Sequence, residues 1–124
     1  MILLPGERAL MSEYPEEFFS RAYYAGFGEV DFFACDGRCN RATRPFACRV
    51  FPLAPRLRQG EWSSRTDARG RPVCPLCQGP KGALQKQFIL NAEEAFRILA
   101  QEEEGARFLA AWMDAEKMYR EPLW

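Results

Sequence analysis

The sequence predicts a small α+β domain with an irregular centre, a short strand or hairpin, and a helical C-terminal part. Its 124 residues are enough for one domain of ordinary size. Of these residues, 48% are hydrophobic and 14% are aromatic, as in globular proteins. Helical periodicity is confined to the last third of the chain, whereas residues 36–82 hold six prolines and five glycines. We therefore expect a single domain over residues 1–124.

The N-terminal third predicts one helix and one strand. In SEYPEEFFSRAYY, Ser12 or Tyr14 precedes Pro15 and an acidic first turn, so we expect a helix over about 15–24. The following FGEVDFFAC alternates loosely and is rich in β-forming residues, which favours a strand over about 29–34.

The central stretch 36–82 shows little periodicity. Such a length is too great for a plain loop in a compact domain unless something else orders it. Its FPL segment, Phe51 to Leu53, is expected to form core together with Trp62.

The last third predicts helices, over about 84–120. In NAEEAFRILAQEEE, Asn91 stands as the N-cap with Glu94 three residues later, an outline of a capping box. Gly105 is expected to break or cap this helix. Two apolar stripes at helical spacing predict core packing: Ala92, Ala95, Phe96 and Leu99, then Phe108, Leu109, Trp112, Ala115 and Tyr119.

Net charge is zero, but charge is unevenly placed along the chain. Residues 1–34 hold two basic and six acidic side chains (net −4), residues 35–90 hold eleven and three (net +8), and residues 91–124 hold four and eight (net −4). Fourteen of the 17 basic residues are arginine, which forms directed, bidentate hydrogen bonds. The centre is therefore a basic segment between two acidic ends.

That basic segment contains all five cysteines, at positions 35, 39, 48, 74 and 77. Two close pairs separated in sequence, with a single cysteine between them, form a chelating layout, because short loops bring each pair onto one ion. Five is an odd number, so a secreted disulfide framework would leave one thiol over. Clustered thiols in a reducing cytosol more often indicate metal or redox chemistry, and we expect a cytoplasmic protein with residues 35–77 as its metal-binding segment.

The residues around the thiols support the same interpretation. The cysteines could instead be small buried hydrophobic residues. That alternative is less favoured, because the neighbours are too polar for an ordinary core strand: Asp36, Gly37, Arg38, Asn40 and Arg41. Four thiolates on a divalent cation leave a net charge of −2, which nearby arginines can offset while donating to sulfur. Arg38, Arg44 and Arg49 are the candidates for this supporting role.

The sequence also resembles a known family in this region. CDGRC, the string RPFACRVFPL and the later CPL are similar to the YkgJ-type cysteine-cluster family of zinc- or iron-chelating domains, and LLPGE precedes the cluster as in some bacterial members. The likeness spans roughly residues 2–76. It implies four metal ligands at Cys35, Cys39, Cys48 and Cys74, with Cys77 as the alternative fourth ligand. Many members have a further Cys-Cys cluster upstream, and its absence here favours one mononuclear ion.

Zinc is the expected metal, and iron or an iron–sulfur cluster is the alternative, because four cysteines without histidine suit both. A closed four-cysteine zinc site is usually structural, since no position remains for water. We therefore expect a non-catalytic metal-binding protein. A redox, metal-delivery or maturation factor is the alternative, since CPLC is also a CxxC motif, although it does not lie in a βαβ pattern.

Hydrolase chemistry is not expected, and no catalytic residue is assigned. The chain has no histidine, so the usual Ser–His or Cys–His base is missing. Phosphate-loop and dinucleotide-binding motifs are absent from the sequence. The paired carboxylates Glu16–Glu17 and Glu93–Glu94 lie where helix starts favour them.

A nucleic-acid-binding module is a further alternative, because the basic segment interleaves arginines with Phe46, Phe51 and Trp62. Against it, the pI of about 6.3 is below the strongly basic range of such domains. The arginines outside the cysteine cluster are instead expected to be solvated: Arg56, Arg58, Arg65, Arg69 and Arg71. Nucleic acid is therefore not an expected partner. A membrane is not expected either, because no apolar run approaches the roughly 20 residues that span a bilayer. An unidentified protein partner and the oligomeric state stay open.

Overall fold

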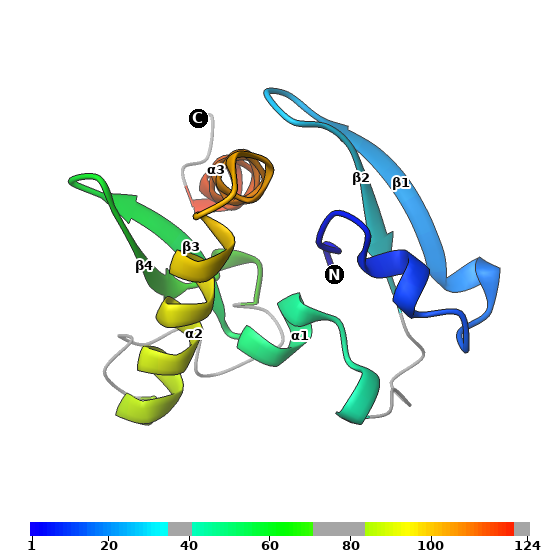
Figure 1. Ribbon diagram of the computed structural model, residues 1–124, viewed down its shortest axis with the longest axis horizontal. Coiled ribbons are helices and arrows are strands. Elements are labelled where there is room, and N and C mark those ends of the chain that lie inside the picture. The colour runs from blue at the N-terminus through cyan, green and yellow to red at the C-terminus, as the bar shows by residue number, and fades with distance from the viewer. Residues whose placement is uncertain (35–40, 71–83, 121–124) are drawn as a thin grey trace. The chain divides into compact units, whose positions relative to one another are not determined.

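The computed structural model describes residues 1–34, 41–70 and 84–120. The chain divides into two compact units, Met1–Arg49 and Val50–Trp124. Each unit contains one two-stranded antiparallel sheet, and the second also contains the two long helices (Figure 1). This arrangement confirms the predicted α+β class, with its hairpin and its helical C-terminal part.

The first unit is built on the hairpin of β1 (Phe19–Tyr24) and β2 (Gly28–Phe33). The N-terminal segment lies along the other edge of β2, where Leu3 N donates to Asp31 O at 2.9 Å and Phe33 N donates to Met1 O at 2.8 Å. Two short 3-10 helices, η1 (Glu7–Leu10) and η2 (Glu16–Phe18), complete this part of the chain.

Aromatic packing forms the core of the first unit. Leu3, Met11 and Phe33 are buried, and the partly buried Tyr14, Phe18 and Phe19 pack against them. The Phe33 ring is the centre, since its centroid lies 4.9 Å from that of Tyr14, 5.5 Å from that of Phe19 and 6.0 Å from that of Phe18. Aromatic pairs at such separations stabilise beyond their buried area.

The predicted helix over about 15–24 is wrong, whereas the predicted strand over about 29–34 is confirmed as β2. The acidic start after Pro15 produces only the three-residue η2, and residues 19–24 form β1. Pairing decides the outcome, because Phe19 lies opposite Phe33 and the chain reverses through Gly26 and Gly28, which both have positive φ. Cross-strand contacts of this kind override a local helix preference.

The central stretch is more regular than the sequence predicts. After η3 (Arg41–Thr43) and α1 (Phe46–Val50), the second unit begins with a hairpin of β3 (Leu53–Arg58) and β4 (Glu61–Thr66), followed by η4 (Ala68–Gly70). The hairpin closes through Gln59 and Gly60, both at positive φ, as tight two-residue turns require. Its strands, LAPRLR and EWSSRT, hold three arginines, two serines and a proline, so they give little β pattern in the sequence, which does not predict them.

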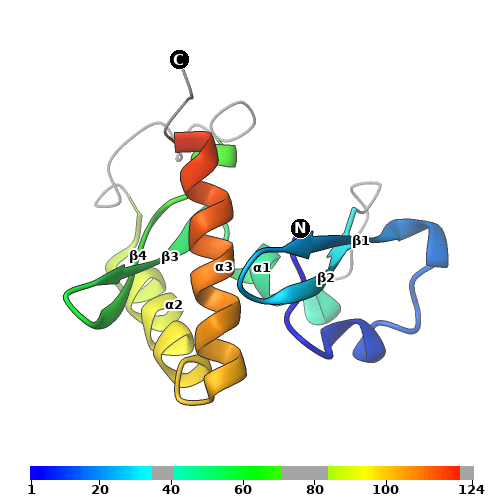
Figure 2. The ribbon, with the colours of Figure 1, turned by 90° about the horizontal axis from the view of Figure 1, so that it is seen from above.

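The helices α2 (Lys86–Leu99) and α3 (Glu103–Arg120) cover this hairpin (Figure 2). Helix α2 contacts β4 and β3, while α3 contacts β3 and η4. Phe96, Phe108 and Trp112 are buried where the helices meet, and the Trp112 ring stands edge-on to Phe96 at 5.8 Å between centroids. The two predicted apolar stripes are confirmed for the described side chains. The side chain of Tyr119, the last member of the second stripe, is not among those described.

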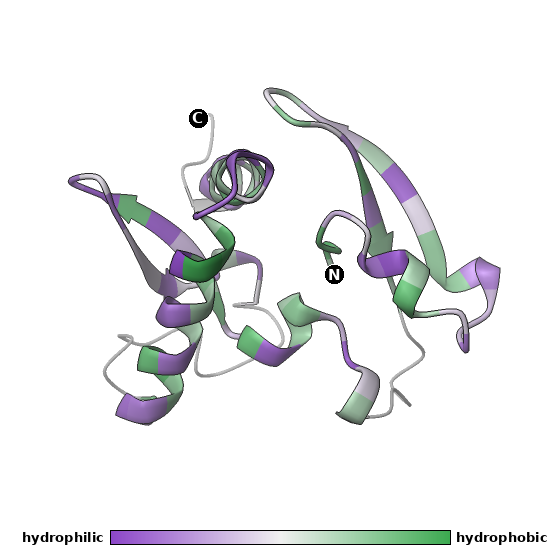
Figure 3. Cartoon of the chain, in the orientation of Figure 1, coloured by the Kyte–Doolittle hydropathy of each residue, from purple (hydrophilic) through white to green (hydrophobic). Residues whose placement is uncertain are grey.

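Two expectations about helix ends are wrong. Helix α2 begins at Lys86 with Gln85 as its N-cap, so Asn91 lies inside the helix, where its Oδ1 accepts from Gln87 Nε2 at 2.8 Å. The five residues before Asn91, KQFIL, form the first part of α2. Figure 3 shows polar and apolar residues interspersed along the whole of this helix. Gly105 lies within the first turns of α3, and a Cβ there would come within 1.9 Å of Leu99 O. This glycine therefore permits the close approach of α2 and α3 and does not end a helix.

Candidate functional site

Of the predicted thiol ligands, the structure describes Cys48 alone. Cys35, Cys39, Cys74 and Cys77 lie outside the described residues, as does Arg38. Among residues 1–34, 41–70 and 84–120, no three metal-binding side chains come together. Cys48, with the residues that hold its helix, is therefore the part of the predicted site whose geometry can be described.

Cys48 is half-buried on α1, a five-residue helix fixed at its start by a distant carboxylate. The Phe46 amide donates to Glu7 Oε2 at 2.8 Å, across 39 residues of sequence. The other oxygen of Glu7, Oε1, accepts from the Leu4 amide at 2.9 Å. Glu7 thus ties the N-terminal LLPGE segment to the helix that carries the thiol. A side chain on such a fixed element is held in one orientation, which a metal ligand requires.

Glu7 was not among the predicted site residues. Its partner lies 39 residues along the chain, and the only signal in the sequence is that LLPGE precedes the cysteine cluster.

Arg49 braces the chain just before α1. Its Nε donates to Arg44 O at 3.0 Å and its Nη2 donates to Ala42 O at 2.8 Å. Hydrogen bonds from a charged donor are worth about 1.5–3 kcal/mol each when sheltered, and less at an exposed site such as this one. Arg49 therefore fixes the conformation of the backbone between residue 41 and α1. This role does not depend on the predicted donation from Arg49 to sulfur.

Arg44 has a different character. Its Nε is buried and has no acceptor among the described residues. A buried donor without an acceptor is unfavourable by about 1–3 kcal/mol. Arg44 stands four residues before Cys48, so this unsatisfied donor lies in the segment where an anionic group such as a thiolate is predicted.

A pocket of about 340 Å³ opens beside η1 and α1. It is lined by Glu7, Leu10, Met11, Ala42, Thr43, Arg44, Phe46 and Arg49. Both oxygens of its one carboxylate are used by backbone amides. The polar side chains of this pocket therefore serve first to fix the backbone around α1.

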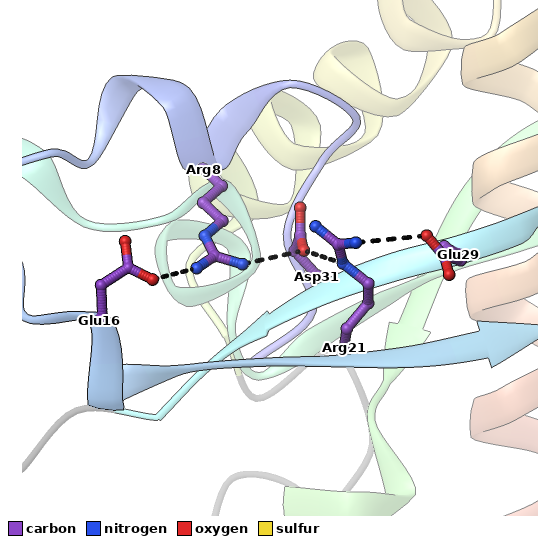
Figure 4. Close-up of polar contacts among 5 residues, drawn as sticks. All are labelled: Arg8, Glu16, Arg21, Glu29 and Asp31. Carbon is purple, nitrogen blue, oxygen red and sulfur yellow. Dashed lines mark hydrogen bonds and ion pairs between the residues drawn. The ribbon is translucent and has the colours of Figure 1, made fainter.

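A ladder of alternating charges lies on one face of the first hairpin (Figure 4). Arg8 contacts Glu16 at 2.6 Å and Asp31 at 3.5 Å, and Arg21 contacts Asp31 at 3.3 Å and Glu29 at 3.4 Å. The guanidinium of Arg8 also lies 4.7 Å from the centre of the Phe19 ring. Both arginines thus form ion pairs with carboxylates of their own unit. Through Arg8 and Glu16, the ladder also holds η1 and η2 against the sheet.

In the second unit, a buried carboxylate holds the chain that leads toward Cys74. Glu116 of α3 is fully buried, and it accepts from Arg65 Nη2 and from the Ala68 amide, each at 2.9 Å. The Arg69 guanidinium donates two hydrogen bonds to Asp67, at 3.1 and 2.9 Å. The described chain is therefore firmly anchored up to residue 70.

These contacts bear on the arginines that were expected to be solvated. Arg65 and Arg69 are partly buried and form ion pairs, so that expectation is wrong for both. Arg58 is exposed and Arg56 is half-buried, while Arg71 lies outside the described residues. Two arginines of the basic segment are thereby used within the fold.

No helix within the described ranges is both long enough and apolar enough to cross a bilayer. The chain matches no protein-family model, no curated protein and no solved structure. The resemblance to the YkgJ-type family accordingly stays a prediction from the motifs.

Proposed function

We propose that this chain is a non-catalytic metal-binding protein in which the thiolates of Cys35, Cys39, Cys48 and Cys74 hold a single zinc ion. The observation that carries the proposal is the cysteine spacing, with Cys48 half-buried on a helix whose start is fixed by Glu7. A zinc ion bound by four thiolates supplies folding free energy and no open position for water. We place the protein in the YkgJ-type family on the strength of its motifs, and in the cytoplasm because its thiols need a reducing compartment.

The described residues fit such an ion in two respects. Cys48 belongs to a helix held by polar contacts at its start and along the preceding segment, so its sulfur is carried by an ordered element. The buried Nε of Arg44 lacks an acceptor among the described residues, and a thiolate-bearing site would supply one. Together these residues would orient a ligand and offset part of the charge of the thiolates.

Metal content tests the proposal directly. We would measure zinc, iron and inorganic sulfide in protein purified with and without air, and count reactive thiols in the same samples. The expected result is one zinc ion per chain with one reactive thiol, that of Cys77. No metal, together with five reactive thiols, would overturn the proposal.

Two single substitutions sharpen this experiment. Cys48→Ser removes a proposed ligand and is expected to abolish stoichiometric zinc binding. Cys77→Ser is the matched control and is expected to keep the zinc while removing the reactive thiol. The reverse outcome would make Cys77 a ligand and exclude Cys48. Iron with sulfide in the anaerobic sample would instead indicate an iron–sulfur or maturation protein.

A further inference from the structure

The two edges of the first sheet differ in their backbone hydrogen bonds. Asp31 O and Phe33 N of β2 bond to the N-terminal segment, so the backbones of these residues face away from β1. In an antiparallel ladder, the residues opposite them then face away from β2. These are Arg21 and Phe19, and by the two-residue alternation Tyr23 as well.

The outward backbone groups of β1 can be counted. The Phe19 amide donates to Glu16 O, so it is already used. The amides and carbonyls of Arg21 and Tyr23 bond to none of the described residues. They form a short row of donors and acceptors along the outer edge of β1 that the described part of the chain leaves open for pairing.

This edge also lacks three of the features by which strands avoid pairing with other chains. Natural edge strands carry lysine, proline or a bulge, whereas β1 reads FSRAYY and pairs one to one with β2. Its only charge, Arg21, is held by Glu29 and Asp31. Four of its six residues are exposed, and Tyr23 is 76% exposed.

We propose that the outer edge of β1 is an association surface for a second copy of this chain. The two β1 strands pair antiparallel about a two-fold axis at Ala22, with Arg21 opposite Tyr23 of the partner subunit. This register satisfies all four outward backbone groups in each copy. Placing Arg21 opposite Arg21 of the partner subunit would instead set like charges together, which destabilises a strand pair.

The charges around Arg21 favour a second copy as the partner, and the small size of the contact favours weak binding. Each Arg21 already lies beside Glu29 and Asp31 of its own sheet. The register that sets it opposite Tyr23 of the partner subunit keeps the two arginines apart, and each guanidinium gains an aromatic ring as its neighbour. The contact is isologous, as in most homodimers. Two six-residue strands bury less than the roughly 1,200 Å² of a stable interface, so dimerisation should depend on concentration.

Sedimentation equilibrium of the full chain, from micromolar to millimolar concentration, tests this proposal together with amide hydrogen exchange. We expect the average mass to rise toward that of a dimer and the exchange of the Arg21 and Tyr23 amides to slow as it does. The Ser20 and Ala22 amides face β2 and should not change. A monomer at every concentration, or association without slower exchange at Arg21 and Tyr23, would overturn the proposal.

A pair of lysine substitutions supplies the matched control. Tyr23→Lys places a positive charge opposite Arg21 of the partner subunit and should leave the chain monomeric. Leu57→Lys makes the same kind of change on the second hairpin, at a residue that is 43% exposed, and should leave dimerisation intact. Loss of the dimer in Leu57→Lys but not in Tyr23→Lys would refute the assignment of this edge.

Discussion

Glu116 shows how hydrogen bonds allow a charged side chain to be buried in the core of the second unit. Its side chain is fully buried, and its two oxygens accept from a guanidinium of β4 and from a backbone amide of η4. A buried ion pair is not by itself a strong source of stability, but removing one partner leaves the other without compensation. Two residues along, the exposed Met118 shows how abruptly α3 passes from core to surface.

We expect Glu116→Gln to lower the free energy of unfolding by about 3 kcal/mol, because Arg65 would face an amide in a sheltered site. Guanidinium-chloride unfolding measures this change. The control is Asp114→Asn, on the exposed side of the same helix, which should change stability by less than about 0.5 kcal/mol. Equal effects of the two substitutions would show that the pair with Arg65 contributes nothing.

At the scale of elements, neighbouring glutamates in α2 have different roles. Oε2 of Glu93 accepts from both the amide and the hydroxyl of Ser64 in β4, at 2.8 and 2.7 Å, and so fixes the helix to the strand. Glu94 is exposed and forms an ion pair with Arg97 of the same helix, at 3.3 Å. The sequence assigned both residues to a helix start, but α2 begins seven residues before Glu93.

Glu93→Ala is therefore expected to destabilise the protein by about 2 kcal/mol, since a buried strand residue loses a charged acceptor. Glu94→Ala should have an effect below about 0.5 kcal/mol, as for exposed ion pairs one turn apart. Thermal and denaturant unfolding of both variants provides the comparison. Similar losses of stability in the two variants would contradict the role of Glu93 as a tie between α2 and β4.

What the sequence could predict follows from the range of each interaction. The periodic apolar residues of α2 and α3, such as Phe96 and Trp112, repeat within one or two turns and so were visible. The sequence predicts a helix where β1 forms, because the conformation of β1 is decided by its pairing with β2. The same holds for the site: cysteine spacing is local, whereas the contact of Glu7 with Phe46 spans 39 residues.

At the scale of the whole molecule, each unit has its own set of buried aromatic residues. Phe33 gathers the aromatic side chains of the first unit, and Trp112 packs against Phe96 and Phe108 in the second. The sequence predicts one domain over residues 1–124, and within it the backbone contacts form two compact units, Met1–Arg49 and Val50–Trp124. Separate cores permit separate opening, because local stability follows the density of buried contacts.

Matched core substitutions test whether the units open independently. Phe33→Leu should lower the opening free energy of the β1 and β2 amides by about 1.5 kcal/mol, because the ring contacts are lost while most apolar volume is kept. The α2 and α3 amides should change by less than about 0.5 kcal/mol. Phe96→Leu should have the converse effect, since its ring packs on Trp112. Residue-resolved hydrogen exchange measures both sets of amides in each variant. Equal shifts in all amides would contradict independent opening and show one cooperative unit, as the predicted single domain implies.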